Sequence, residues 1–69
     1  MNVPKNERVM LTYVFDGVDC YKVTRNIIGK YTLYKIIDNT LHKLKTSESA
    51  SDFDAIVIKD REVIVCKSR

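Results

Sequence analysis

The side chains best suited to chemistry in this chain are one histidine, two cysteines and a closely spaced pair of aspartates. His42 is the only histidine, and Cys20 and Cys66 lie far apart, with no Cys-x-x-Cys motif. Three such residues cannot form a closed zinc site of four Cys or His ligands. Asp52 and Asp54 would point to the same side of a strand, but nothing nearby completes an oxygen shell for a cation. We therefore predict no metal or cofactor site.

Nucleophilic catalysis has equally little support. No nucleophile motif surrounds His42, and Cys20 falls in an apolar pattern, where a thiol is inert rather than activated. We expect Cys20 and Cys66 to act as small buried hydrophobes, with a disulfide between them as the alternative. A chain of 69 residues also has little room for a substrate pocket. We predict a protein that has no catalytic residues, is not an enzyme and takes no small-molecule substrate.

Length and composition predict one small globular domain spanning residues 1–69, with 45% hydrophobic and 30% charged residues. A core of this size stabilises a fold only marginally, so dimerisation is a reasonable expectation. The N-terminus has no signal-peptide pattern. The longest apolar run, Val63 to Cys66, is far shorter than the roughly 20 residues that span a membrane. These features predict a soluble, cytoplasmic protein with no membrane partner.

The clearest local pattern is a β-hairpin over residues 7–26. Apolar and other residues alternate through residues 8–15, and Asp16-Gly17 is the strongest short signal for a type I′ turn. A two-residue loop fixes the register of the two strands. The predicted cross-strand pairs are Phe15 with Val18, Tyr13 with Cys20, Leu11 with Lys22, and Val9 with Thr24.

A second hairpin is predicted at the C-terminus, in residues 53–69. With Asp60-Arg61 in the turn, Lys59 faces Glu62, and a further pair of opposite charges forms near the strand ends. Between them the predicted strands are apolar on both faces, which is typical of strands covered on two sides or of an edge buried in a dimer.

The segment from residue 27 to residue 45 fits two structures. Its apolar residues follow helical spacing and would form one stripe. Its composition, however, favours strands on either side of a turn at Asp38-Asn39, because such residues tolerate positive φ. In the strand interpretation Tyr31 and Tyr34 lie on opposite faces, whereas in a helix both turn inward.

We favour the strand interpretation, which predicts an all-β fold. It consists of about three consecutive antiparallel hairpins in a small sheet or barrel. The alternative is an α+β domain of the ββαββ type, with its helix near residues 27–45.

The basic side chains are concentrated in the middle of the chain. Residues 22–45 carry six lysines and arginines against one acid. Lysines neutralise phosphates and tyrosines stack on bases, so this segment is a candidate for sequence-tolerant nucleic-acid binding. Lysine also protects sheet edges from aggregation, which explains part of the charge without a ligand. The candidate nucleic-acid surface comprises Lys30, Tyr34, Lys35, Lys43 and Lys45.

The favoured hypothesis for function is a non-enzymatic interaction module. A sheet edge offers unpaired backbone groups to which another strand can be added. The second face of the first hairpin also carries three apolar residues, Met10, Tyr21 and Val23, which form a candidate protein-interaction face. We expect the partner to be another protein or a second copy of the chain in a homodimer, with nucleic acid as the alternative.

Overall fold

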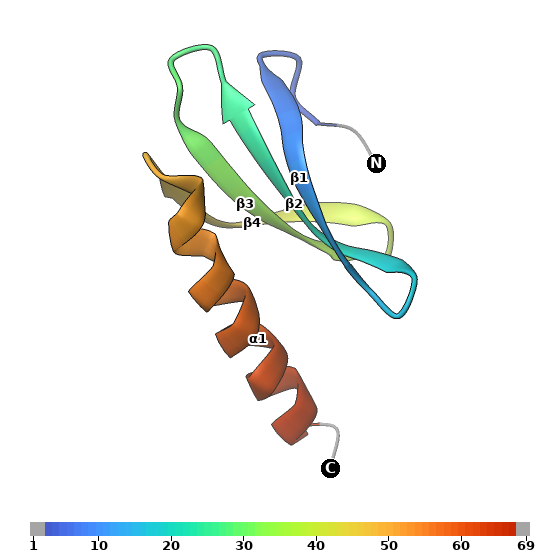
Figure 1. Ribbon diagram of the computed structural model, residues 1–69. Coiled ribbons are helices and arrows are strands. Elements are labelled where there is room, and N and C mark those ends of the chain that lie inside the picture. Colours follow the sequence, from blue (N-terminus) through green and yellow to red (C-terminus); the bar gives the residue numbers. More distant parts are fainter. Residues whose placement is uncertain (1–2, 68–69) are drawn as a thin grey trace.

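A computed structural model describes the backbone of residues 3–67 and the side chains of residues 3–62. The chain forms a four-stranded antiparallel sheet with strand order β1-β2-β3-β4, followed by one helix (Figure 1). The elements are β1 (Glu7–Phe15), β2 (Val18–Asn26), β3 (Tyr31–Ile37), β4 (Thr40–Ser47), a short 3₁₀ helix η1 (Ala50–Asp52) and α1 (Phe53–Lys67). The fold is therefore mostly β, with two hairpins and a helix in place of three hairpins.

The first hairpin forms around the predicted turn. Asp16 and Gly17 have φ angles of 55° and 75°, the positive values that a type I′ turn requires. The register matches the prediction at both ends, where Phe15 faces Val18 and Val9 faces Thr24.

In the middle of this hairpin the predicted register is wrong, because each strand contains a bulge. Met10 on β1 and Cys20 on β2 are the extra residues, so Tyr13 faces Tyr21 instead of Cys20, and Leu11 faces Val23 instead of Lys22. A bulge inserts one residue into one strand and changes the face on which its neighbours lie. The two insertions compensate, which is why both ends of the hairpin agree with a regular ladder.

The second hairpin confirms the strand interpretation of the middle segment, and a helix at residues 27–45 is wrong. Asp38 and Asn39 form the turn with φ angles of 50° and 62°. β3 pairs with β2 on one side and with β4 on the other. As predicted for strands, Tyr31 and Tyr34 lie on opposite faces, since Tyr34 comes three residues after Tyr31 and successive side chains of a strand alternate. Neither tyrosine is exposed.

The predicted C-terminal hairpin is wrong, because this segment forms α1. Phe53 and Val57 are buried one helical turn apart, and Asp60 and Arg61 continue the same stripe toward the sheet. The stripe changes from apolar to charged along its length, so a search for apolar periodicity misses it. Asp54 lies in the first turn, where a negative charge favours the helix dipole. Within residues 3–67, no helix has the length and apolar character needed to cross a membrane.

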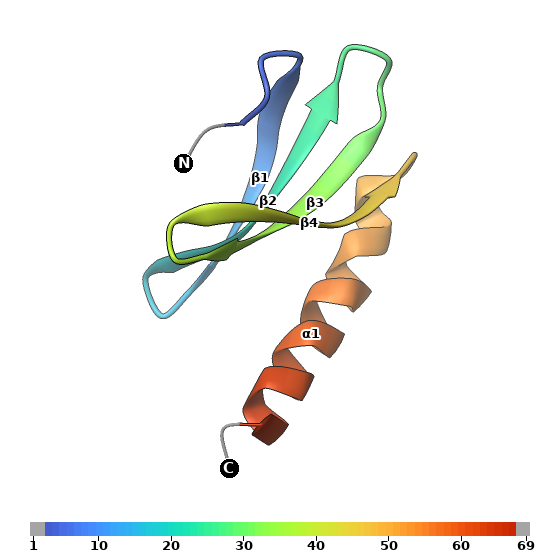
Figure 2. The ribbon, with the colours of Figure 1, turned by 180° about the vertical axis from the view of Figure 1, so that it is seen from behind.

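The core lies between α1 and one face of the sheet. Phe53 and Val57 pack against Tyr21, Val23 and Leu33, and all five side chains are at most 1% exposed. Figure 2 shows from behind how α1 starts beside the end of β4 and runs along the sheet. A 15-residue helix is marginal by itself in water, so its burial against β2 and β3 supplies much of its stability.

Two neighbouring helix positions provide a test of this packing. Val57→Ala should lower the free energy of unfolding by about 2 kcal/mol, because it removes a fully buried side chain and leaves a cavity. Ile58→Ala is the control: Ile58 is 60% exposed, so its removal should change stability by less than about 0.5 kcal/mol. Urea titration followed by circular dichroism measures both, and equal losses would contradict the packing of α1.

Candidate interaction surface

Two tyrosines of the sheet donate hydrogen bonds to carboxylates of α1 and so fix the position of the helix. Tyr13 donates to Asp54, and Tyr21 donates to Asp60. The Lys35 ammonium lies 2.8 Å from the Asp60 carboxylate in a half-buried ion pair. Burial, followed by the carboxylate contacts, raises the pKa of Tyr13 to about 12 and also raises the pKa of Tyr21. For Asp60 burial acts to raise the pKa, but the bonds from Lys35 and Tyr21 outweigh it and lower the pKa.

A second polar cluster lies on the face of the sheet opposite α1. The Glu7 carboxylate on β1 accepts hydrogen bonds from the Thr24 hydroxyl at 2.7 Å and from the Tyr34 hydroxyl at 2.8 Å. Thr24 is fully buried and Tyr34 is 6% exposed. Burial and the contact with Glu7 raise the pKa of Tyr34 to about 12. This cluster ties β1 to β3 across β2, and it uses the Tyr34 side chain within the protein.

The structure does not gather the residues of the candidate nucleic-acid surface into one patch. Tyr34 and Lys35 are engaged in the contacts above. Lys43 faces Tyr34 and Lys45 faces Leu33, so the two exposed lysines lie on opposite faces of the sheet. Lys30 stands in the loop between β2 and β3, at the far end of β3 from Lys35. No stacking tyrosine therefore accompanies these lysines at the surface.

The candidate protein-interaction face predicted from the first hairpin is largely internal. Tyr21 and Val23 are 1% and 0% exposed, because the bulges turn them toward α1. Only Met10 of the three is exposed, at 55%. Of this candidate face, only the part on β1 therefore remains accessible.

The residues first considered for chemistry, Asp52, His42 and Cys20, lie apart from one another in the structure. Asp52 accepts a hydrogen bond from the Ser47 hydroxyl at 2.8 Å, and His42 is exposed on β4. The Cys20 thiol is half-buried beside the core and lies 3.4 Å from the carbonyl oxygen of Val18. The side chain of Cys66 lies outside the described residues, and so does the alternative of a disulfide between Cys20 and Cys66. Among the described residues, no group of three His, Cys, Asp or Glu side chains is placed to hold a metal ion.

The most apolar exposed element of the described chain is β1, a strand at the edge of the sheet. Its backbone pairs only with β2, so its other side presents unpaired amide and carbonyl groups. Four of its nine residues are large, exposed hydrophobics: Val9 at 43%, Met10 at 55%, Leu11 at 47% and Val14 at 52%. No local pattern in residues 7–15 indicates that this strand lies at an edge, because strand order depends on tertiary pairing. Leu11 and Val14 were therefore missed as surface residues.

The opposite edge of the sheet has a different character. β4 pairs only with β3 and exposes His42, Lys43 and Lys45, with Leu44 between them at 40%. Lysines along an edge strand disfavour the approach of another strand, because they would be desolvated beside its backbone. The sheet therefore has one protected edge at β4 and one open apolar edge at β1.

A second exposed apolar feature is the loop between β2 and β3. Ile27 and Ile28 are 89% and 84% exposed. The loop has internal hydrogen bonds: the Asn26 side-chain oxygen accepts from the backbone amides of Ile28 and Lys30. Gly29 has a φ of 89°, which a residue with a side chain rarely adopts.

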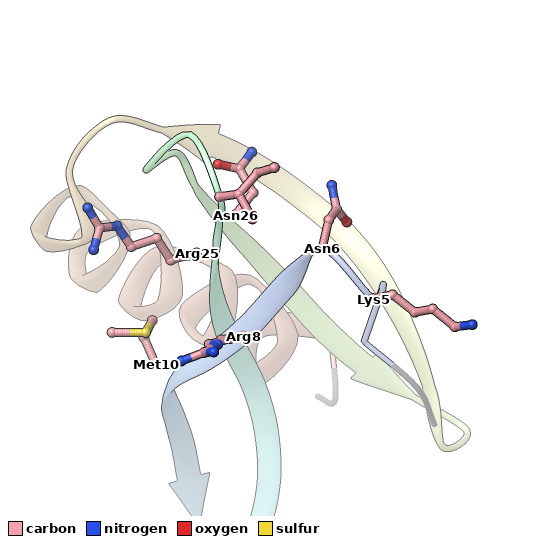
Figure 3. Close-up of a pocket in the computed structure, with 7 residues that line it drawn as sticks. Lys5, Asn6, Arg8, Met10, Arg25 and Asn26 are labelled. Atoms are coloured by element: carbon pink, nitrogen blue, oxygen red, sulfur yellow. The ribbon is translucent and has the colours of Figure 1, made fainter.

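A hollow of about 490 Å³ lies beside this loop and the start of β1. In Figure 3, Arg8, Met10 and Arg25 reach toward one side of the β1–β2 ribbon, while Lys5 extends away from them. Arg8 and Arg25 are directly opposite each other in the ladder. Like charges in that position destabilise a strand pair, although Arg25 also stacks over the Tyr31 ring at 5.7 Å. This end of β1 therefore carries positive charge that an acidic group could neutralise.

Comparison of the chain with protein-family models, with curated proteins and with solved structures finds no match.

The ion pair between Lys35 and Asp60 predicts a loss of stability in acid. Because the pKa of Asp60 is lower in the folded protein, the unfolded chain takes up the proton first as the pH falls. The stabilisation that the ion pair contributes is complete above about pH 5, and it is lost as the pH falls through the pKa of Asp60 in the folded protein. Free energies of unfolding measured from pH 7 to pH 3 should fall less steeply in Asp60→Asn and in Lys35→Met than in the wild type. An unchanged pH dependence in both variants would contradict this role of the pair.

Proposed function

We propose that this protein is a small, non-enzymatic interaction module that binds an extended strand at the open edge of β1. The observation that carries this proposal is the run of exposed hydrophobic residues on an edge strand whose outer backbone groups have no partner within the sheet. Strand addition satisfies such groups with main-chain hydrogen bonds, while side chains on the two faces provide the specificity.

The side chains of β1 suit this mode of binding. Leu11 lies on the face that α1 covers, and Val14 lies on the opposite face, so an added strand would find an apolar contact on both sides. From Leu11 to Phe15, β1 has no extra residue of its own, since the second bulge is on β2. These five residues are a usual length for one strand of a sheet.

The rest of the fold holds this edge in place without covering it. Glu7 anchors the start of β1, and Tyr13 anchors its middle to α1. Near its end, the Arg61 guanidinium lies 3.6 Å from the centre of the Phe15 ring. A binding strand would therefore meet an edge already in its bound shape, which reduces the entropic cost of association.

Strand addition can be tested with a peptide unrelated to this chain. The probe is a nine-residue peptide of alternating threonine and valine with a lysine at each end. Titrated into the ¹⁵N-labelled protein, it should shift the amide signals of β1 and leave those of β4 unchanged. Val14→Lys should weaken binding about tenfold, because it replaces an apolar contact with a charge at the strand edge.

The matched control is Leu44→Lys, which makes the same kind of change on the other edge strand. Leu44 is 40% exposed, so this variant should fold normally and bind the peptide as the wild type does. Equal weakening by both substitutions, or amide shifts centred on β4, would contradict binding at the β1 edge.

A further inference from the structure

We propose that the end of the molecule formed by the β2–β3 loop docks on a membrane surface that contains anionic lipids. Ile27 and Ile28 would insert at the boundary between headgroups and acyl chains, and the arginines beside them would bind lipid phosphates. This inference is independent of the proposed function, which concerns the edge of β1 at residues 11–15. The sequence-based prediction of no membrane partner concerns spanning segments, and surface binding needs none.

The loop presents two adjacent isoleucines to solvent. Ile27 and Ile28 are 89% and 84% exposed, and no other large hydrophobic side chain of residues 3–62 exceeds 60%. Figures 1 and 2 show the loop projecting from the end of the sheet, beside the turn that precedes β1. Single exposed hydrophobic residues are usual on protein surfaces, but an adjacent pair at the tip of a projecting loop marks a site of apolar contact.

The backbone of this loop is largely satisfied without water. The Asn26 side-chain oxygen accepts hydrogen bonds from the amides of Ile28 and Lys30, at 3.1 and 2.9 Å. The Gly29 amide donates to the Asn26 carbonyl, and the Asn26 amide donates to the Lys30 carbonyl, both at 3.0 Å. Because an unpaired amide is costly to remove from water, these bonds lower the cost of placing the tip at a lipid interface.

Cationic side chains lie around the apolar tip. Arg25 and Lys30 flank the loop, while Lys5 and Arg8 lie at the neighbouring start of β1, and all four are exposed. The hollow of about 490 Å³ is lined by Lys5, Arg8 and Arg25 and also by Ile27, so the cations and the tip share one surface. Near an anionic membrane each such cation strengthens binding roughly fivefold.

The two arginines have no acidic partner within the described part of the protein. Arg8 and Arg25 face each other across the β1–β2 ladder, and like charges in that position repel. Within residues 3–62 the only ion pair joins Lys35 to Asp60. A phosphate between the arginines would remove the repulsion, because the guanidinium fork binds phosphate oxygens in a bidentate manner. Arg25 is at most about 7 Å along the chain from Ile27, which is comparable to the depth of about 5–10 Å that apolar side chains reach at the interface.

The acidic residues at this end of the sheet leave that surface positive. Glu7 accepts hydrogen bonds from Thr24 and Tyr34 on the face opposite α1. Glu48 and Asp52 follow β4, which β3 separates from β2. The positive charge is therefore concentrated on the β1 and β2 side of this end, around the base of the loop.

The isoleucines favour a membrane over nucleic acid as the partner of these cations. Sequence-tolerant binding of single strands relies on aromatic rings that stack on bases. The aromatic residue next to the cations is Tyr31, and the Arg25 guanidinium already lies over its ring, 5.7 Å from the centre. Aliphatic side chains at the tip have no such use with bases, whereas lipid acyl chains accept them.

Cosedimentation of the full chain with vesicles tests the docking. The protein should bind phosphatidylcholine vesicles that contain about 30% phosphatidylserine at about 0.1 M salt, and it should bind pure phosphatidylcholine vesicles much more weakly. The double variant Ile27→Ser, Ile28→Ser should bind the anionic vesicles roughly tenfold more weakly, because it removes the apolar contact. The double variant Arg8→Gln, Arg25→Gln should bind them about thirtyfold more weakly.

Matched controls make the same changes elsewhere on the surface. Val18→Ser with Ile58→Ser alters two side chains that are each 60% exposed, away from the loop. Lys43→Gln with Lys45→Gln removes two exposed cations from β4. Both controls should bind within about threefold of the wild type, because neither position touches the docked surface. Circular dichroism establishes that each variant is folded.

Insertion of the tip is measured by fluorescence, because the chain contains no tryptophan. A tryptophan introduced by Ile28→Trp should emit at shorter wavelength when anionic vesicles are added, since its ring moves into the interface. Val18→Trp, at the other end of the β1–β2 hairpin, should keep its emission unchanged.

The docking is overturned if the wild type does not bind anionic vesicles, or if either loop or arginine double variant binds them as tightly as the wild type. It is also overturned by an unchanged emission of Ile28→Trp, or by binding to a single-stranded oligonucleotide without binding to vesicles. The threonine–valine peptide should still shift the β1 amides of the Ile27→Ser, Ile28→Ser variant, so failure of one proposal is distinguished from failure of the other.

Discussion

The packing of Phe53 and Val57 against Val23 and Leu33 is the contact on which the other features of this structure depend. It gives a short helix the apolar burial that it lacks in isolation, and it covers one face of a sheet that would otherwise be unstable in water. It also requires Val23 and Tyr21 to point toward α1. The two bulges of the first hairpin meet that requirement while leaving its turn and its outer end in regular register.

Once the helix lies on the sheet, its polar contacts follow from the geometry. Buried tyrosine hydroxyls need partners, and the helix and the start of β1 provide carboxylates for Tyr13, Tyr21 and Tyr34. Lys35 neutralises one of these acids. A tyrosine and a lysine that could have served a nucleic-acid surface are thereby used within the protein, so the basic character of the middle of the sequence does not become a basic surface with a stacking platform.

The two edges of the sheet differ in the way that matters for association. Lysines on β4 make the approach of another strand costly, whereas β1 exposes hydrophobic residues beside unpaired backbone groups. A sheet with one open edge can gain a strand only at that edge, and no further strand can be added once the edge is paired.

The turns were determined by the sequence itself. Asp16-Gly17 and Asp38-Asn39 adopt positive φ because of local chemistry, and that was enough to predict both hairpins and the opposite faces of Tyr31 and Tyr34. Tertiary structure decided the rest. Residues 53–67 are rich in β-branched side chains, yet they form a helix, and the sheet offers a surface on which its residues Phe53 and Val57 are buried. The bulges at Met10 and Cys20, and the position of β1 at an edge, likewise depend on what packs against the sheet, and local sequence does not encode that.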